Sequence, residues 1–149
     1  MKKYVLFGVL FVSLITGAVI YQHFSSGGGS GSGTEVDWRL LGDMDYVTGK
    51  ASSELNALDG QRVRIPGFMV PLEDEQKLVK EFLLVPSPQA CIHVPPPPPN
   101  QMVYVKMKEG VDVAFGPIWV YGTLKLTAVR SMYGEASFEL SSDFIEEYK

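Results

Sequence analysis

A run of five consecutive prolines, Pro95 to Pro99, places the strongest constraint on how this chain can fold. Proline cannot continue a helix and carries no backbone N–H, so the run supplies no donors to a hydrogen-bonded element. We expect it to hold a polyproline II conformation about 15 Å long. The run therefore predicts a stiff strut, which fixes the orientation of the residues beside it.

The residues directly before the strut include two side chains that suit a soft metal ion. Cys91 is the only cysteine, and His93 is the only histidine after the N-terminal segment. In an extended backbone, residues two apart point to the same face, so the thiol and the imidazole would project together. Such a pair suits Zn(II) or Cu(I), and zinc is the metal that we expect here.

Two protein ligands do not complete a tetrahedral zinc site. A site completed by water, a partner chain or nearby side chains would bind zinc weakly and exchange it readily, as in a carrier or sensor. Methionine is more often a core residue than a ligand, and an acidic run is usually a solvated turn. The side chains that are candidates for additional ligands are Glu73, Asp74, Glu75 and Met69.

Two other interpretations of this segment stay open. In the first, Cys91 is a small buried apolar residue, and His93 hydrogen-bonds carbonyl groups of the proline segment. In the second, Cys91 is a nucleophile with His93 as its base and Asn100 as the orienting group. Catalytic Cys/His pairs usually come from separate elements, so we do not expect an enzyme. Asn100 and Gln101 are expected to satisfy backbone groups where the prolines end.

The N-terminus carries a membrane signal. Lys2 and Lys3 precede an uncharged, largely apolar stretch from Tyr4 to Tyr21. As a helix, this stretch would span about 27 Å, close to the thickness of a bilayer core. The lysines keep that end cytoplasmic, so the rest of the chain would lie outside the inner membrane, in the periplasmic space. A cleaved signal peptide, with Thr16-Gly17-Ala18 as the cleavage site, is the alternative.

The composition divides the chain into three segments. Residues 1–24 are expected to form the signal-anchor, a single transmembrane helix. Residues 25–33 consist entirely of glycine and serine and predict a flexible linker. Residues 34–149 then form one extracytoplasmic domain.

The composition excludes one class of function and narrows the fold. The net charge is −4 and no basic block follows Lys2 and Lys3, so nucleic-acid binding has little electrostatic support. A single cysteine rules out an internal disulfide. With 15 glycines and 10 prolines in 149 residues, short strands and turns are favoured over helices.

Alternating apolar and polar residues predict five short strands. The first is interrupted at Pro66-Gly67 and then resumes, which is typical of a bulge or a sharp bend. A short helix is expected within residues 36–47 and a helical turn at residues 143–148. The fold class is therefore mainly β, a small OB-like barrel of five strands. The predicted strands cover residues 62–70, 81–85, 101–107, 117–126 and 136–140.

The same alternation predicts which side chains share a face of a strand. Ala136, Phe138 and Leu140 are expected on one face of the last strand. Trp119 and Tyr121 are expected on the outer face of theirs, where they pack on the proline rings, line a groove or cover the barrel.

Four segments of the chain form a recognisable set of motifs. They are Gly67-Phe68-Met69-Val70-Pro71-Leu72, Phe82-Leu83-Leu84-Val85-Pro86, Cys91-Ile92-His93-Val94-Pro95-Pro96-Pro97 with Asn100-Gln101, and Val120-Tyr121-Gly122-Thr123-Leu124. Over roughly Trp38 to Tyr148, the chain resembles the bacterial family catalogued as domain of unknown function 3299. The resemblance implies exported or membrane-tethered proteins that accompany ABC transporters of the lipoprotein-export and macrolide-export type. Several such clusters are tied to zinc supply.

Together, these features predict a non-enzymatic accessory protein in zinc homeostasis, tethered to the inner membrane with its domain in the periplasm. Its partner would be an ABC-transporter permease or a periplasmic metal-binding protein. The alternative is a structural adaptor of an ABC-transporter-type membrane complex that holds no metal.

Overall fold

The structure is a computed structural model that describes residues 31–74, 77–88 and 95–149. The unit that contains these residues runs from Gly31 to Lys149, so it begins three residues before the predicted domain boundary. Within the described residues, no helix has both the length and the apolar character needed to cross a bilayer. The predicted signal-anchor, residues 1–24, lies outside this part of the chain.

The described part of the chain is mainly β with few short helices, as the sequence predicts, and the first of its three helical segments lies within the predicted range 36–47. In chain order, the elements are β1 (Thr34–Glu35), α2 (Trp38–Leu41), α3 (Ser53–Asn56), β2 (Arg62–Pro71), β3 (Val79–Val85), η1 (Pro99–Gln101), β4 (Val103–Val111), β5 (Ile118–Lys125), β6 (Val129–Ser131), β7 (Gly134–Ala136) and β8 (Phe138–Glu147).

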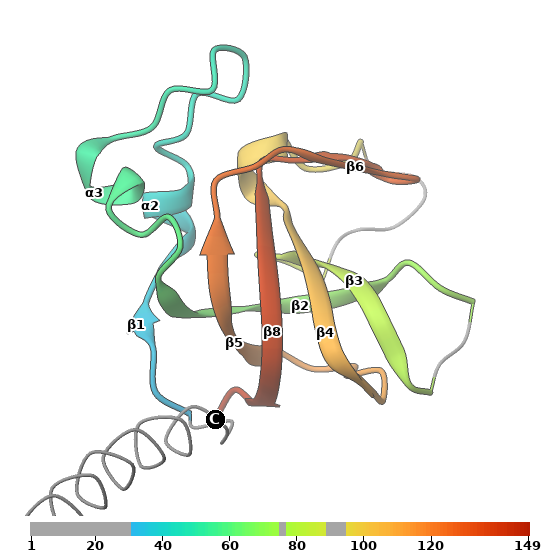
Figure 1. Cartoon of the computed structure of the whole chain (residues 1–149). Helices are drawn as coiled ribbons and strands as arrows, with labels where there is room; N and C mark the ends of the chain where they lie inside the picture. Colours follow the sequence, from blue (N-terminus) through green and yellow to red (C-terminus); the bar gives the residue numbers. More distant parts are fainter. Residues whose placement is uncertain (1–30, 75–76, 89–94) are drawn as a thin grey trace, which may run out of the picture. The chain divides into compact units, whose positions relative to one another are not determined.

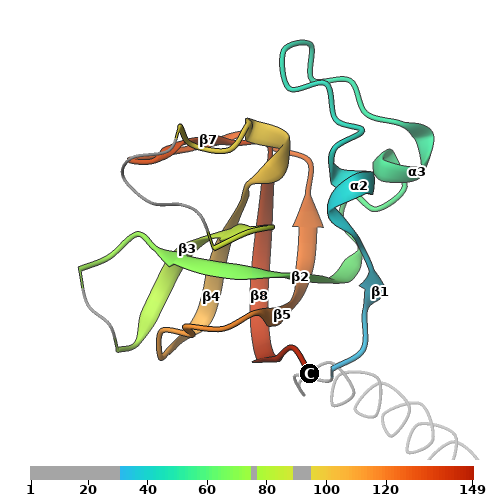
Figure 2. The same cartoon turned by 180° about the vertical axis from the view of Figure 1, so that it is seen from behind.

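Five of the strands form a closed barrel (Figure 1). They pair in the order β2, β3, β4, β8 and β5, and β5 pairs back to β2. The neighbours are antiparallel except for β4 and β8, which are parallel. The short β1 adds to β2 in parallel, beside α2 (Figure 2). The predicted five-stranded barrel is confirmed.

Strand β2 reaches around the barrel and changes its partner halfway. Its residues from Arg62 to Gly67 pair with β5, and those from Phe68 to Pro71 pair with β3. The predicted interruption at Pro66-Gly67 is the point of this change, although the strand itself is continuous. A Cβ atom on Gly67 would lie 2.8 Å from Leu84 Cγ, so only glycine permits this approach of the two strands.

Proline is tolerated inside β2 because Pro66 faces a gap between two neighbouring strands. The Arg64 carbonyl accepts from Val36 N at 3.0 Å. The backbone N–H and C=O groups of even-numbered residues in the first half of β2 therefore point towards β1. At Pro66, β1 has ended and the pairing with β3 has not begun. The missing N–H therefore costs no ladder hydrogen bond, while the Pro66 carbonyl accepts from Trp38 Nε1 at 2.6 Å.

The inward-facing side chains of the barrel strands form one apolar core. The two α-helices add the fully buried Leu41 and Leu55 to it. Each helix starts at a side-chain cap, since Asp37 accepts from Leu40 N at 2.8 Å and Ser52 accepts from Leu55 N at 3.2 Å. The strand residues of the core include Val63, Ile65, Met69, Phe82, Leu84, Val103, Val105, Met107, Ile118, Val120, Leu124, Phe138 and Leu140.

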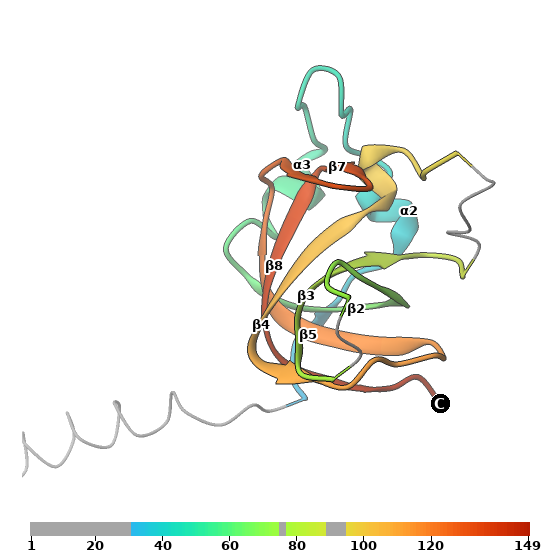
Figure 3. The same ribbon diagram turned by 90° about the vertical axis from the view of Figure 1, so that its right-hand side faces the viewer.

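A second apolar cluster lies on the outer face of β3 and β4. The hairpin of β6 and β7 packs beside η1 over this side of the barrel (Figure 3). Ala136 belongs to this outer cluster, whereas Phe138 and Leu140 belong to the core, so the prediction that all three share one face is wrong. The reason is a break at Ser137, whose amide donates to the Pro99 carbonyl instead of continuing a strand.

The predicted helical turn at residues 143–148 is also wrong, because β8 continues as a strand to Glu147. Its last residues pair with β5, including Phe144 with Tyr121 and Glu147 with Ile118. A ladder with this distant strand satisfies the backbone of the segment.

We predict that Gly67→Ala destabilises the protein by about 1–3 kcal/mol, since the added methyl group overpacks against Leu84 and Val85. Urea unfolding measures the change. Gly116→Ala is the matched control, because a Cβ atom there meets nothing within 4 Å. Equal stability of the two variants would contradict the role assigned to Gly67.

Candidate functional site

The predicted metal ligands fall into two groups in the structure. Cys91, His93 and Glu75 lie outside the described residues. The other three, Met69, Glu73 and Asp74, are described, and they come from the end of β2 and the connection that follows it. Within the described residues, no three His, Cys, Asp or Glu side chains cluster closely enough to hold a metal ion.

The three described candidates line one hollow of about 440 Å³, which we call the β2 hollow. It opens where β2 leaves β5, between the second half of β2 and the β4–β5 connection. Pro88, three residues before Cys91, also lines it. Its described lining comprises Phe68, Met69, Val70, Pro71, Glu73, Asp74, Pro88, Val113, Ala114 and Phe115.

The three side chains differ in how free they are to bind a ligand. Met69 is only 8% exposed and belongs to the core, as expected for most methionines. Glu73 accepts from Lys80 N and Glu81 N through Oε1, both at 3.2 Å, and so holds the start of β3. Asp74 is the more available of the two carboxylates, since both are exposed and Glu73 already accepts two backbone hydrogen bonds.

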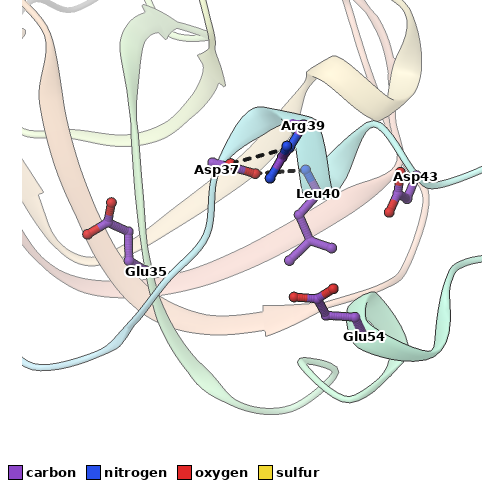
Figure 4. Close-up of a pocket in the computed structure, with 6 residues that line it drawn as sticks. All are labelled: Glu35, Asp37, Arg39, Leu40, Asp43 and Glu54. Carbon is purple, nitrogen blue, oxygen red and sulfur yellow. Dashed lines mark hydrogen bonds and ion pairs between the residues drawn. The ribbon is translucent and has the colours of Figure 1, made fainter.

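A second hollow, of about 410 Å³, lies beside α2 and α3 and is mainly acidic (Figure 4). Two of its four carboxylates have structural tasks: Asp37 caps α2, and Glu35 contacts Arg64 at 2.7 Å. Sequence reasoning missed this hollow because its residues are spread over three elements and form no motif. It is lined by Glu35, Asp37, Arg39, Leu40, Asp43 and Glu54.

Arg64 organises a polar and aromatic network on the outer face of β2 and β5. Its guanidinium lies 4.6 Å from the centre of the Trp119 ring, a cation–π distance. A hydrogen bond with Tyr121 and then the contact with Glu35 raise the pKa of Arg64 above its ordinary value. The Tyr121 hydroxyl donates to Glu146. Tyr121 is 1% exposed, so it covers the barrel and does not line a groove.

Asn100 and Gln101 satisfy backbone carbonyl groups, as predicted, but most of these groups belong to a distant segment. Asn100 Nδ2 donates to the carbonyls of Gly42 at 3.1 Å and Met44 at 3.0 Å. Gln101 Nε2 donates to the Trp38 carbonyl at 3.2 Å. The two amides therefore fasten α2 and the turn after it to the end of the proline segment.

Replacement of Asn100 is expected to release this contact. Asn100→Ala should lower the free energy of unfolding by about 1–3 kcal/mol, because two carbonyl groups lose their donor. Asn100→Asp should cost at least as much, since its carboxylate would face the same two oxygens. Amide exchange in α2 should accelerate in both variants. Asn56→Ala, which removes an exposed and local hydrogen bond, is the control and should change little.

Tyr104, on the outer face of β4, has a strongly shifted phenol. It is 8% exposed, and its hydroxyl donates to Glu81 Oε2 at 2.8 Å. Burial, and then the hydrogen bond to Glu81, raise the pKa of Tyr104 to about 12. The folded state therefore holds this proton more tightly than an unfolded chain, in which the tyrosine pKa is about 10.

This shift predicts how stability depends on pH. The contribution of Tyr104 is complete below about pH 10 and is lost as the pH rises to about 12. Tyr104→Phe should therefore lose less stability than the parent between these pH values, as measured by urea unfolding. Tyr133→Phe, which changes an exposed tyrosine, should lose as much free energy of unfolding as the parent over the same pH range. If Tyr104→Phe lost as much free energy of unfolding as the parent, the raised pKa assigned to Tyr104 would be contradicted.

The comparisons with known proteins place this architecture in a family. Residues 43–147 match the family model described as "Protein of unknown function (DUF3299)". The chain is also similar to the crystal structure of a DUF3299 family protein from Pseudomonas aeruginosa PAO1, with 35% identity and a TM-score of 0.63. That match covers 80% of this chain and 98% of the other. Comparison with curated proteins gives no match. The chain belongs to the DUF3299 family.

Proposed function

We propose that the protein is a membrane-tethered, non-enzymatic accessory protein in zinc homeostasis, built on an OB-like barrel. Two features support the OB-like description: the order of the five barrel strands and the parallel pairing of β4 with β8. OB-like barrels carry many unrelated functions, so the fold alone assigns none. The proposal rests instead on the β2 hollow.

The observation that carries the zinc proposal is that three of the candidate ligands line one hollow. Met69, Glu73 and Asp74 line the same hollow as Pro88. Cys91 follows Pro88 by three residues in the sequence, and three residues of extended chain span at most about 11 Å. A thiolate, an imidazole and the Asp74 carboxylate are ligands that zinc accepts. With a fourth position left to water or a partner, zinc would exchange readily.

Attachment to the inner membrane and work with a transporter complete the proposal. Their support is the apolar stretch from Tyr4 to Tyr21 and the family resemblance. The partner would be an ABC-transporter permease or a periplasmic metal-binding protein, which passes zinc to or takes it from the domain.

A structural adaptor that holds no metal is the second candidate. The observation that favours it is the apolar wall of the β2 hollow, where Phe115 is 88% exposed. Large exposed apolar side chains beside a hollow are typical of a surface that binds another protein. On this proposal, the Cys91 and His93 segment is a folding element.

Zinc titration separates the two candidates. Zinc that binds only the native state should raise the melting temperature, equivalent to about 2.7 kcal/mol at a hundredfold excess over Kd. The shift should vanish in Cys91→Ala and in His93→Ala and decrease in Asp74→Asn. Asp112→Asn, an exposed aspartate that does not line the hollow, should behave as the parent. A shift that persists without Cys91 and His93 would refute the zinc proposal.

A further inference from the structure

The second half of β2 has a strand partner on one side only. Phe68 to Pro71 pair with β3, whereas β5 pairs only with the earlier residues of β2. The Leu72 amide donates to the Glu81 carbonyl of β3 at 3.2 Å. The backbone N–H and C=O groups of even-numbered residues in this half of β2 therefore point towards β3. The backbone of Met69 and the Pro71 carbonyl therefore point to the opposite side. Among the described residues, no strand pairs with them there.

This open edge forms one wall of the β2 hollow. The facing wall is Val113 to Phe115, in the connection that leads into β5. The side chains of Phe68 and Val70 are half-buried, and Phe115 is almost fully exposed. An extended chain lying in the hollow would meet backbone groups on one side and apolar side chains on the other.

The charge of the hollow is negative at one end. Glu73 and Asp74 line it just beyond β2, and its described lining contains no lysine or arginine. Glu73 is engaged by two backbone amides, while Asp74 is exposed. Opposite charge at this end would fix the direction in which a bound segment lies.

We propose that the β2 hollow binds a short extended segment of a partner protein, which adds to β2 as a strand. The segment lies antiparallel to β2, as β5 does, and continues the ladder that β5 leaves at Gly67. It exchanges both backbone hydrogen bonds with Met69 and donates one to the Pro71 carbonyl. Since Pro71 has no N–H, the ladder ends there and the segment is short.

The side chains of the segment follow from the same geometry. Alternate residues are apolar and pack beside Phe68, Val70 and Phe115, because strand side chains alternate between faces. A lysine or arginine lies near the start of the segment, beside Asp74, since the antiparallel direction places that end past Pro71. This inference rests on the adaptor function proposed above and names the chemistry of its partner.

The probe is a peptide of alternating valine and threonine residues that begins with lysine, titrated into the full-length protein in detergent micelles. Fluorescence anisotropy should show saturable binding, and hydrogen exchange of the Met69 amide should slow on binding. Methylation of alternate backbone nitrogens in the peptide should abolish binding, because it removes the donors of the ladder. Glutamate in place of lysine should weaken binding about tenfold.

Matched variants test the surface itself. Phe115→Ser and Asp74→Lys should each weaken peptide binding about tenfold. Val47→Ser and Asp112→Lys are the controls, since both change exposed side chains that do not line the hollow, and both should bind as the parent does. All four positions are exposed, so the variants should keep the parent's melting temperature.

Several results would overturn the inference: no binding at millimolar peptide, equal binding of the methylated peptide, or binding unaffected by Phe115→Ser. Dimerisation of the parent that Phe115→Ser abolishes would also overturn it, because the occupant would then be a second copy of the chain. Zinc titration reports separately on Cys91 and His93. Loss of peptide binding with zinc binding intact therefore rejects this inference and leaves the zinc proposal in place.

Discussion

The change of partner along β2 is the constraint on which the rest of the structure depends. One strand must pair with β5 and then with β3 for five strands to close into a barrel. The change falls at Gly67, where only glycine fits, because the Leu84 side chain and the Val85 carbonyl occupy the space of a Cβ atom. The β2 hollow opens at the same point, where the pairing of β5 with β2 ends. Closure of the core and the candidate binding surface therefore have one physical origin.

Hydrogen bonds between distant segments hold the remaining parts against this barrel. Asn100 and Gln101 fasten carbonyl groups of α2 and of the residue after it, and Trp38 of the same helix donates to the Pro66 carbonyl. Each bond contributes about 1 kcal/mol, but an unpaired carbonyl would cost more. The Asn-Gln pair of the family motif thus has a structural task, independent of any chemistry at Cys91.

Both proposed functions use the β2 hollow, for different physical reasons. The zinc proposal depends on donor atoms, of which Asp74 is the freest that the described residues supply. The adaptor proposal depends on an open strand edge and on Phe115. The acidic run does not show which of its carboxylates is free to bind a metal. Glu73 Oε1 accepts hydrogen bonds from two backbone amides of β3. Both carboxylates are exposed, but Glu73 already accepts two backbone hydrogen bonds, which makes Asp74 the freer ligand of the two.

Local alternation was enough to predict the inward positions of Val103, Val105 and Met107 and the outward position of Trp119, because a strand has a period of two. The barrel itself followed from five such segments. Ala136 was assigned to the wrong face because the break at Ser137 arises from a hydrogen bond to Pro99, which lies 38 positions earlier in the chain. The strand at residues 143–147 was missed because its ladder partner, β5, is also distant. Periodicity is a local property that the sequence carries by itself, whereas register, the β2 hollow and the partners of Arg64 depend on which distant strands meet, and only the tertiary structure decides that.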